Sequence, residues 1–324
     1  MKFLRMLLLL SLIPVTGASG AEQIELRLGH IGRPGSLFDL TAREFARRAN
    51  EKLNGRMIVT VHGGSVLGDD TAMLQKVKMG EITFSLPIAV MESVDDVFGI
   101  FEMPFLIRDR AHMRRVRNAI FADTLQPAAK AKGFRLLAIW EVGFRHITNN
   151  VRPITNPQDL KGLRLRVPKG LWRARMFEAY GATPVLLSFD KINEELKKGT
   201  IDGQENPISQ FYPAGIHEQQ KYLTLSYHVY SPAFLIVSEE HFSKLPRDVQ
   251  AVLSRVASEL QDWSLKEGEK LDQELIGKLR STMEINQIDL IEFLHDAATG
   301  IYQDYAAAVP HGAELIVRIE AQKQ

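Results

Sequence analysis

The segment Lys161–Pro168, KGLRLRVP, places two arginines in a short predicted strand that ends at Pro168. A strand between helical segments is expected in a parallel sheet covered on both faces, where side chains are normally apolar. Arg166 stands at the carboxyl end of this strand, where open α/β sheets bind ligands. We therefore predict that Arg166 contacts a ligand carboxylate. The alternative is an arginine that pairs with a neighbouring acid or reaches the surface, and Arg164, nearer the middle of the strand, fits that description better.

The first 21 residues have the pattern of an export signal. Lys2 and Arg5 precede an apolar run from Met6 to Ile13, and small residues follow as far as Ala21, after which we expect cleavage. The apolar run is too short to span a bilayer, and no second run follows it. We therefore expect an exported chain without a transmembrane helix.

Composition narrows the class of protein further. Without Lys2 and Arg5, the 40 basic side chains fall to 38 against 39 acidic ones, which argues against nucleic acid or an anionic membrane as a partner. The sequence contains no cysteine, which excludes disulfides, thiolate catalysis, cysteine-ligated zinc and a lipoprotein anchor. A large exported chain without disulfides suggests a bacterial periplasmic protein that is stabilised by its core alone.

Two segments of the chain repeat one plan of alternating strands and helices. The first is predicted as strand 24–29, helix 36–53, strand 57–61, helix 70–79 and strand 82–86. The second is predicted as strand 163–167, helix 172–180, strand 184–187, helix 190–198 and a strand from 201 onward. Ser36 can cap the first helix, and Asp69 or Asp70 the second. VKMGEITF and LKKGTIDG, at corresponding places, each lead from a helix through a glycine into a strand. Two similar lobes are therefore predicted, since 324 residues exceed what one core usually holds.

Further elements are expected to connect the lobes. Residues 134–140 and 145–149 are predicted as strand segments that cross from one lobe to the other, and 227–237 as the return crossing. From Pro246 to Leu279 the apolar residues keep a helical spacing. A continuous helix there would be about 50 Å long and would brace both lobes. The alternative is two helices separated near Gly268.

Enzyme signatures are incomplete in this sequence. It contains neither GxGxxG nor GxxxxGK[ST], so phosphate-cradling loops lack support. GGSVLG lacks the second glycine of a GxSxG nucleophile elbow, and HEQQK lacks the second histidine of HExxH. The nine histidines show no ligand spacing. We therefore predict no catalytic residues, no metal and no cofactor.

Polar residues that follow predicted strands form a candidate recognition set. Arg145 lies near the expected cleft, Arg166 ends a strand, and Asn206 stands just past another strand. A guanidinium pairs a carboxylate with two parallel hydrogen bonds, which an ammonium group cannot do. Nearby aromatic residues either cover the apolar part of a ligand or pack in the core; they are Trp140, Phe144, Trp172, Phe189, Phe211 and Tyr212. The full predicted ligand-binding set is Arg166, Arg145, Asn206, Phe189, Trp172, Asp70 and Phe211.

Several motifs together resemble the solute-binding proteins of tripartite ATP-independent periplasmic (TRAP) transporters, the DctP-type family. They are LGDD, EMPFL, GFRHITN, LKGLRLRVP, YGATPV and IDGQENP, and the resemblance runs from about Ile24 to about His241 and, less specifically, to the end of the chain. It implies a two-lobed α/β periplasmic-binding-protein fold with crossing strands and a long bracing helix. It also implies a selectivity arginine at Arg166, a second ligand arginine at Arg145 and a ligand asparagine at Asn206, with Phe189 lining the pocket. On this basis we assign 22–140 and 231–270 to lobe one, and 141–230 and 271–324 to lobe two.

The resemblance has departures that bear on the ligand. Members that bind sialic acid carry an acid where this chain reads SLPIAV, so sialic acid is not expected. DKINEELKKG replaces the usual EVYxALQ helix, and Trp172 and Arg173 could favour an aromatic acid or a second anionic group. We predict a monomeric periplasmic receptor that closes on a small organic acid and delivers it to a TRAP permease. Four-carbon dicarboxylates, sugar acids, hydroxy or keto acids and aromatic acids all remain open. A receptor for a membrane sensor kinase and a periplasmic enzyme are the alternatives.

Overall fold

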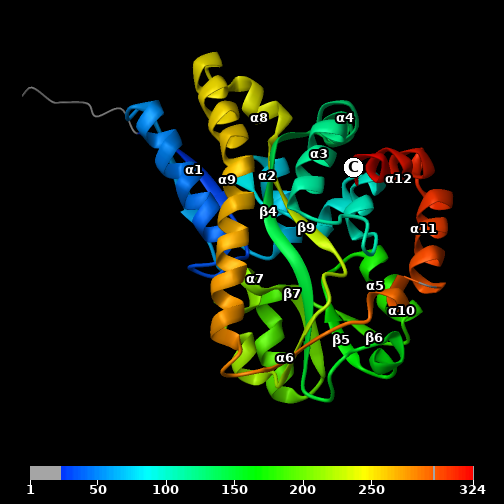
Figure 1. Cartoon of the computed structure of the whole chain (residues 1–324). Helices are drawn as coiled ribbons and strands as arrows, with labels where there is room; N and C mark the ends of the chain where they lie inside the picture. The colour runs from blue at the N-terminus through cyan, green and yellow to red at the C-terminus, as the bar shows by residue number, and fades with distance from the viewer. Residues whose placement is uncertain (1–22, 295, 324) are drawn as a thin grey trace, which may run out of the picture.

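The computed structural model describes residues 23–294 and 296–323. The predicted export signal, residues 1–21, lies outside the described residues. Within the described part, no helix combines the length and the apolar character that crossing a bilayer requires. Figure 1 shows the chain as strands that run the length of the molecule between an upper and a lower group of helices.

The upper group is built from the first predicted βαβαβ segment. Its elements are β1 (Ile24–Gly29), α1 (Leu37–Leu53), β2 (Met57–His62), α2 (Asp70–Met79) and β3 (Phe84–Ser85). Both caps are as the sequence indicates, because Ser36 accepts a hydrogen bond from the Asp39 backbone N–H and Asp69 accepts one from that of Ala72. The strand predicted at 82–86 is shorter than expected, because the chain bends after Gly80 and Pro87 follows.

The lower group repeats the plan as predicted. Its elements are β5 (Arg164–Val167), α5 (Leu171–Ala179), β6 (Thr183–Leu186), α6 (Ile192–Lys198) and β7 (Gly203–Pro207). The pairs β1–β2, β1–β3, β5–β6 and β5–β7 are all parallel. The two similar α/β halves expected from the sequence are therefore present.

Two long strands join the halves. β4 (Phe134–Asn149) pairs antiparallel with β9 (Tyr230–Ser238) as far as Phe144, and the main path of the sheet has the strand order β2-β1-β3-β9-β4-β7-β5-β6. The predicted strand segments 134–140 and 145–149 both lie in β4, which is one strand of 16 residues and also includes the residues between them. The register shifts between Glu141 and Gly143, whose positive φ of 121° favours glycine.

The long helix is continuous. α9 (Arg247–Leu279) has 33 residues and lies along both halves, packing against α1, β4 and α7 (Figure 1). The alternative of two helices that part at Gly268 is wrong. A Cβ at Gly268 would stand 2.5 Å from Oε1 of Glu141, so this glycine allows the helix to approach the bulge of β4 closely.

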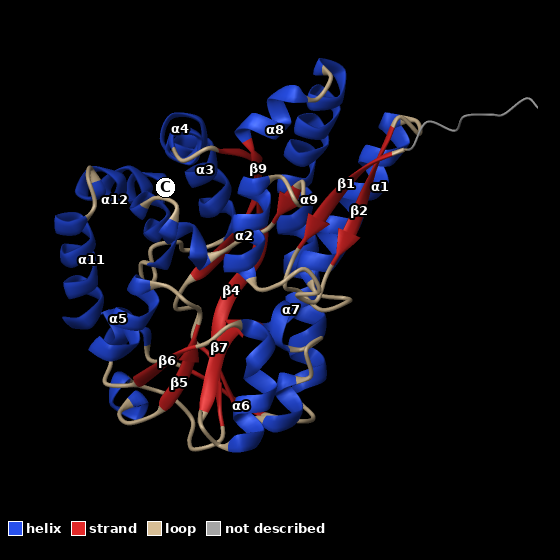
Figure 2. Ribbon diagram, turned by 180° about the vertical axis from the view of Figure 1, so that it is seen from behind, coloured by secondary structure: helices blue, strands red, loops and turns tan. Residues whose placement is uncertain are grey.

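The remaining elements surround this frame (Figure 2). The helices are α3 (Arg110–Ile120), α4 (Gln126–Ala131), α7 (Ile208–Phe211), α8 (Glu239–Lys244), α10 (Leu290–Leu294), α11 (Asp296–Ala308) and α12 (Gly312–Glu320). Two further strands, β8 (Tyr222–Leu225) and β10 (Glu284–Gln287), pair with each other beside β4. Short 3-10 turns include η1 (Ala89–Ser93), η2 (Asp96–Glu102), η4 (Pro157–Leu160), η5 (Phe189–Lys191), η6 (Ile216–Gln219) and η7 (Ala321–Lys323), and η3 (Phe121–Leu125) is a π turn.

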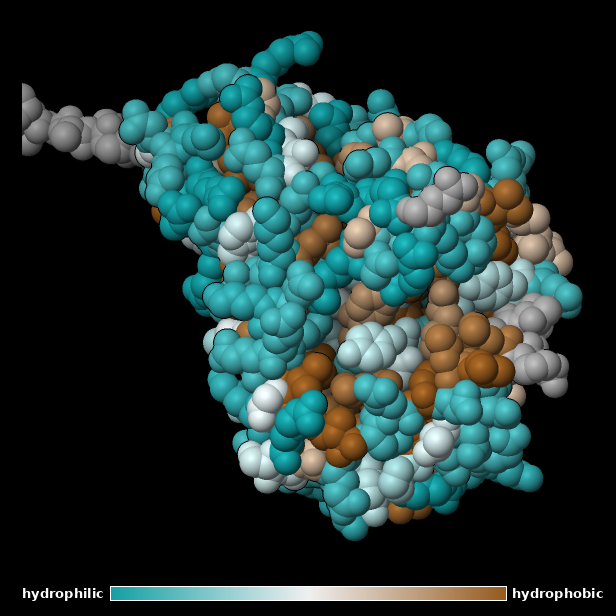
Figure 3. All heavy atoms as spheres, viewed as in Figure 1, coloured by the Kyte–Doolittle hydropathy of each residue, from teal (hydrophilic) through white to brown (hydrophobic). Residues whose placement is uncertain are grey.

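The C-terminal helices touch both halves. α11 packs against α5, whereas α12 packs against α3 and η2 of the upper half. Nε2 of His112 lies 2.9 Å from the carbonyl oxygen of Ile319, and Arg115 donates to that of Gln322 at 2.7 Å. The division into lobes at 140, 230 and 270 stays a prediction. Figure 3 shows a mainly hydrophilic face, with hydrophobic residues gathered toward its centre and right-hand side.

Candidate functional site

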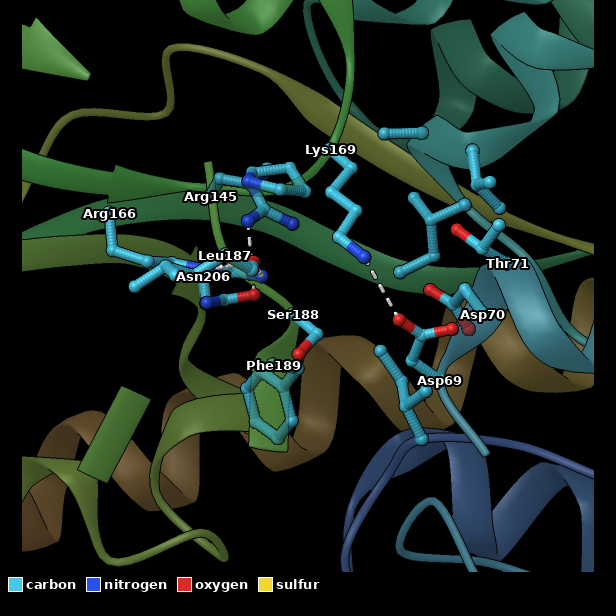
Figure 4. A pocket seen from close by; sticks show the side chains of 15 residues that line it. Asp69, Asp70, Thr71, Arg145, Arg166, Lys169, Leu187, Ser188, Phe189 and Asn206 are labelled. Carbon is cyan, nitrogen blue, oxygen red and sulfur yellow. Dashed lines mark hydrogen bonds and ion pairs between the residues drawn. The ribbon is translucent and has the colours of Figure 1, made fainter. Parts of the chain in front are cut away.

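A cavity opens between the two halves of the sheet, with an empty volume of about 530 Å³ counted out to its open side. Its lower wall comes from the carboxyl ends of β5 and β7, the loop after β6, and Arg145 in β4 (Figure 4). Its upper wall comes from the start of α2, the end of β1 and η1. The lining residues are Ile31, Asp69, Asp70, Thr71, Ile88, Ala89, Val90, Arg145, Arg166, Pro168, Lys169, Leu187, Ser188, Phe189 and Asn206.

Arg166 is a buried cation that lines this cavity. Its side chain is 3% exposed, and its Nε and Nη2 atoms donate to the carbonyl oxygen of Leu187 at 2.9 and 2.6 Å. Among the described residues, no carboxylate lies within 4.0 Å of it. Burial lowers the pKa of this guanidinium to about 9, although Glu205 acts in the opposite direction. The backbone thus orients a charge that has no directly paired carboxylate among the described residues.

Arg145 and Asn206 line the same wall and are held there by hydrogen bonds. Arg145 forms an ion pair with Glu205, and its Nη2 atom donates to Oδ1 of Asn206 at 3.0 Å. Asn206 in turn donates its amide N–H to Gln204. Arg145 and Asn206 are 2% and 4% exposed. Arg145, Asn206 and Glu205 therefore form a rigid, hydrogen-bonded polar unit under the cavity.

Glu205 links this unit to a deeper charge network. It accepts from Nη1 of Arg173 at 2.6 Å, and one of its oxygens lies 3.1 Å from Nε2 of His228. Although burial by itself would raise the pKa of Glu205, the charges of Arg145 and Arg173 hold it well below its usual range. Arg173 also pairs with Glu102 of η2, which joins the lower half to the upper one.

The upper wall presents two adjacent acids. Asp69 pairs with Lys169 across the mouth of the cavity at 3.1 Å (Figure 4). The Oδ1 atom of Asp70 is buried and has no hydrogen-bond partner among the described residues. Burial and the neighbouring Asp69 raise the pKa of Asp70 to about 7, and Arg166 acts against them.

The structure places five of the seven predicted residues in the cavity lining. They are Arg166, Arg145, Asn206, Phe189 and Asp70. The other two predicted residues, Trp172 and Phe211, are not part of this lining. Trp172 is 3% exposed and packs edge-on against Tyr305 of α11, with ring centroids 5.2 Å apart. Phe211 is fully buried in the core through α7, which packs on α9. A residue's position shortly after the end of a strand does not determine whether its side chain faces the cavity or the core, because that depends on the rotation of the helix that carries it.

Other expectations about single residues have clear outcomes. Of the six candidate aromatic residues, Phe189 is the one in the lining. Arg164 is exposed and paired with Asp202, as expected for the outer arginine of KGLRLRVP. The sequence reasoning missed Lys169, Asp69 and the partner role of Glu205. The signal for Glu205 was present, because an acid in IDGQENP directly precedes the predicted Asn206.

Metal chemistry finds no support in the described ranges. No group of three or more His, Asp or Glu side chains in residues 23–294 and 296–323 is placed to hold a metal ion. The arrangement instead offers a buried cation, a neutral amide and an apolar flank, a combination that recognises a carboxylate.

Residues 28–307 match the family described as bacterial extracellular solute-binding protein, family 7. The chain belongs to this family. It is a solute-binding protein of the DctP type, which serves TRAP transporters, and not an enzyme. The periplasmic solute-binding class predicted from the motifs is thereby confirmed.

Related proteins extend over nearly the whole chain. The 2,3-diketo-L-gulonate-binding periplasmic protein YiaO of Escherichia coli is 28% identical over 298 residues, 91% of each chain. A sugar acid binding protein of Advenella mimigardefordensis, solved with galactonate, superposes with a TM-score of 0.89 at 25% identity, covering 93% of this chain and 99% of its own. A TRAP periplasmic solute-binding protein of Sulfurospirillum deleyianum, solved with succinate, gives 0.87 at 28% identity, with 93% and 99% covered. The DctP-type fold is therefore confirmed.

Proposed function

We propose that this protein binds the carboxylate of a small organic acid at Arg166 and carries the acid to a TRAP permease. The single observation that supports this assignment is the buried Arg166 guanidinium, which faces the cavity with no carboxylate partner among the described residues. An uncompensated buried charge is costly unless a partner arrives. A ligand carboxylate supplies that partner.

The remaining cavity residues have distinct roles in this proposal. Asn206 and Arg145 hold the carboxylate from one side, Phe189 covers the apolar part of the ligand, and Asp70 contacts its far end. Exclusion of water strengthens the ion pair, because the interaction is worth more in a low dielectric. Relatives named for 2,3-diketo-L-gulonate, or solved with galactonate or succinate, support an organic acid as the ligand class.

The cellular setting follows from the same proposal. We infer that residues 1–21 direct export and that the mature chain works in the periplasm as a monomer, with the membrane subunits of the transporter as its partner. The two halves meet around the cavity through Lys169 with Asp69 and through Arg173 with Glu102. Ligand contacts to both walls would bias the molecule toward this arrangement.

The test is a comparison of two arginines from one strand. We expect Arg166→Ala to reduce affinity for any bound acid by at least about a hundredfold in calorimetry, since the lost contact is a buried ion pair. Arg166→Lys keeps the charge but loses the planar fork, so it should bind weakly as well. Arg164→Ala is the matched control and should bind as the parent protein does, because Arg164 is exposed and pairs with Asp202. Unchanged affinity in Arg166→Ala would refute the assignment.

A further inference from the structure

Some of the titratable side chains that line the cavity have ion-pair partners and others do not. Five line it, namely Asp69, Asp70, Arg145, Arg166 and Lys169. Arg145 pairs with Glu205 behind the wall, and Lys169 pairs with Asp69 across the mouth. Among the residues that the structure describes, this leaves one cation and one acid in the lining without an ion-pair partner: Arg166 on the lower wall and Asp70 on the upper.

The two unpaired groups lie on opposite sides of the cavity (Figure 4). They are close enough for each to influence the ionisation of the other. The buried Oδ1 atom of Asp70 still needs a hydrogen-bond partner. A ligand that satisfies both groups carries a negative charge at one end and a hydrogen-bond donor at the other.

A second carboxylate at the far end would meet an unfavourable environment. It would approach Asp70 and its neighbour Asp69, and the cation nearest to them, Lys169, is already paired with Asp69. The rest of this region is neutral, since Thr71 and Ser188 carry hydroxyls and Ile88 and Val90 are apolar. Like charges placed together in a buried site cost several kcal/mol, so the cavity carries a built-in penalty for a dianion.

We propose that the cavity selects organic acids with a single carboxylate and a hydroxyl group at the opposite end, and that Asp70 is the residue that rejects dicarboxylates. This inference rests on the proposed function, because the position of the first carboxylate at Arg166 defines which end faces Asp70. In its ionised form Asp70 accepts a hydrogen bond from the hydroxyl, and in its protonated form it can also donate one.

The test uses pairs of acids that share a carbon skeleton and differ at one terminal carbon, which is a hydroxymethyl group in one and a carboxylate in the other. Suitable pairs are 4-hydroxybutyrate with succinate, D-erythronate with meso-tartrate, and D-gluconate with D-glucarate. Calorimetry on the mature protein should show the hydroxy acid binding about a hundredfold more tightly than its partner in each pair that binds. Asp70→Asn should reduce that preference to about tenfold or less, because the like-charge penalty falls.

Asp190→Asn is the matched control. Asp190 is exposed and follows Phe189 at the edge of the cavity, without belonging to its lining, so its loss tests whether any nearby negative charge has the same effect. We expect it to leave the preference unchanged.

The outcomes separate this inference from the proposed function. A dicarboxylate that binds more tightly than its hydroxy partner, a preference that Asp70→Asn does not change, or a failure of all three hydroxy acids to bind would overturn the inference. The proposed function would still stand if some acid bound in a manner that Arg166→Ala abolished. Binding that survives Arg166→Ala would instead refute the proposed function. Melting curves of each variant establish that it is folded.

Discussion

At the scale of single residues, Glu205 explains why Arg145 and Arg166 behave differently although both are buried beneath one cavity. Glu205 pairs with Arg145 and Arg173 and is fully buried. Arg145 is therefore neutralised by Glu205, while Arg166, within the part of the chain that the structure describes, donates to the carbonyl oxygen of Leu187 and pairs with no carboxylate. Because Glu205 pairs with Arg145 and not with Arg166, the positive charge of Arg166 is the one that can pair with a ligand carboxylate.

Replacing Glu205 tests this arrangement. Glu205→Gln should lower the free energy of unfolding by about 3–5 kcal/mol, because it leaves two buried guanidinium groups short of a counter-charge. Chemical denaturation would measure the loss. Glu178→Gln, an exposed position on the same helix as Arg173, should leave stability unchanged. Equal stability of the two variants would show that the network is not needed for folding.

At the scale of elements, α9 shows how a glycine can serve packing within a helix. A Cβ at Gly268 would lie 2.5 Å from Oε1 and 2.8 Å from Cδ of the buried Glu141, and 3.0 Å from Cδ2 of Leu37. Glu141 is held there by Arg110, which also pairs with Asp272 of α9. The glycine thus permits contact between the long helix and the bulge of β4.

The same helix contains a matched control for this reading. Gly268→Ala should destabilise the protein by about 1–3 kcal/mol through overpacking. Gly277→Ala, where nothing lies within 4 Å of the added Cβ, should instead stabilise it by up to about 1 kcal/mol, because alanine is the better helix former. Thermal and denaturant unfolding measure both changes. Stabilisation by both substitutions would contradict the packing role of Gly268.

At the scale of the whole molecule, buried acids make stability depend on pH. Burial raises the pKa of Asp70 and of Glu141 to about 7, and burial also raises the pKa of Glu92, which caps the start of α5 from the other half by accepting from the Leu171 N–H at 2.9 Å. The folded chain keeps these protons where the unfolded chain has lost them. Stability from this source is therefore lost as the pH rises through the folded-state values.

Buried histidines have the opposite effect on the pH dependence of stability, and they exert it at lower pH. Burial lowers the pKa of His30 and His228 to about 4 and that of His146 to about 3. The unfolded chain then binds more protons than the folded one below about pH 6.5, so stability from the histidines rises with pH up to that point. Below about pH 6.5 the buried histidines and the buried acids have opposite effects on how stability changes with pH. Above about pH 6.5 these histidines no longer contribute, and the effect of these acids remains.

We therefore expect the melting temperature to fall between about pH 6.5 and pH 8.5. One proton retained only by the folded state changes the free energy of unfolding by about 1.4 kcal/mol per pH unit. Glu92→Gln should make this fall smaller, because the amide does not titrate. Calorimetric scans across the range measure both slopes. A melting temperature that rises over this interval, or equal slopes in the two proteins, would contradict the assignment.

The sequence by itself determined the local features of this protein. The strands and helices of both halves, the caps at Ser36 and Asp69 and the special position of Arg166 follow from periodicity, capping chemistry and strand ends, which depend on neighbouring residues. Asn206 was predictable as a cavity residue because parallel strands bring their carboxyl ends to one edge, whereas Arg145 lies within the antiparallel strand β4.

Only the tertiary structure decided how distant groups share space and charge. It joined two predicted crossing segments into β4 and kept α9 whole at Gly268. It turned Trp172 and Phe211 into the core, and it paired Arg145 but not Arg166 with Glu205. These outcomes depend on strand register, on the rotation of each helix about its axis, and on which side chain lies within ion-pair distance of a buried charge. Such properties are set by contacts between segments far apart in the chain, so a pattern of neighbouring residues cannot contain them.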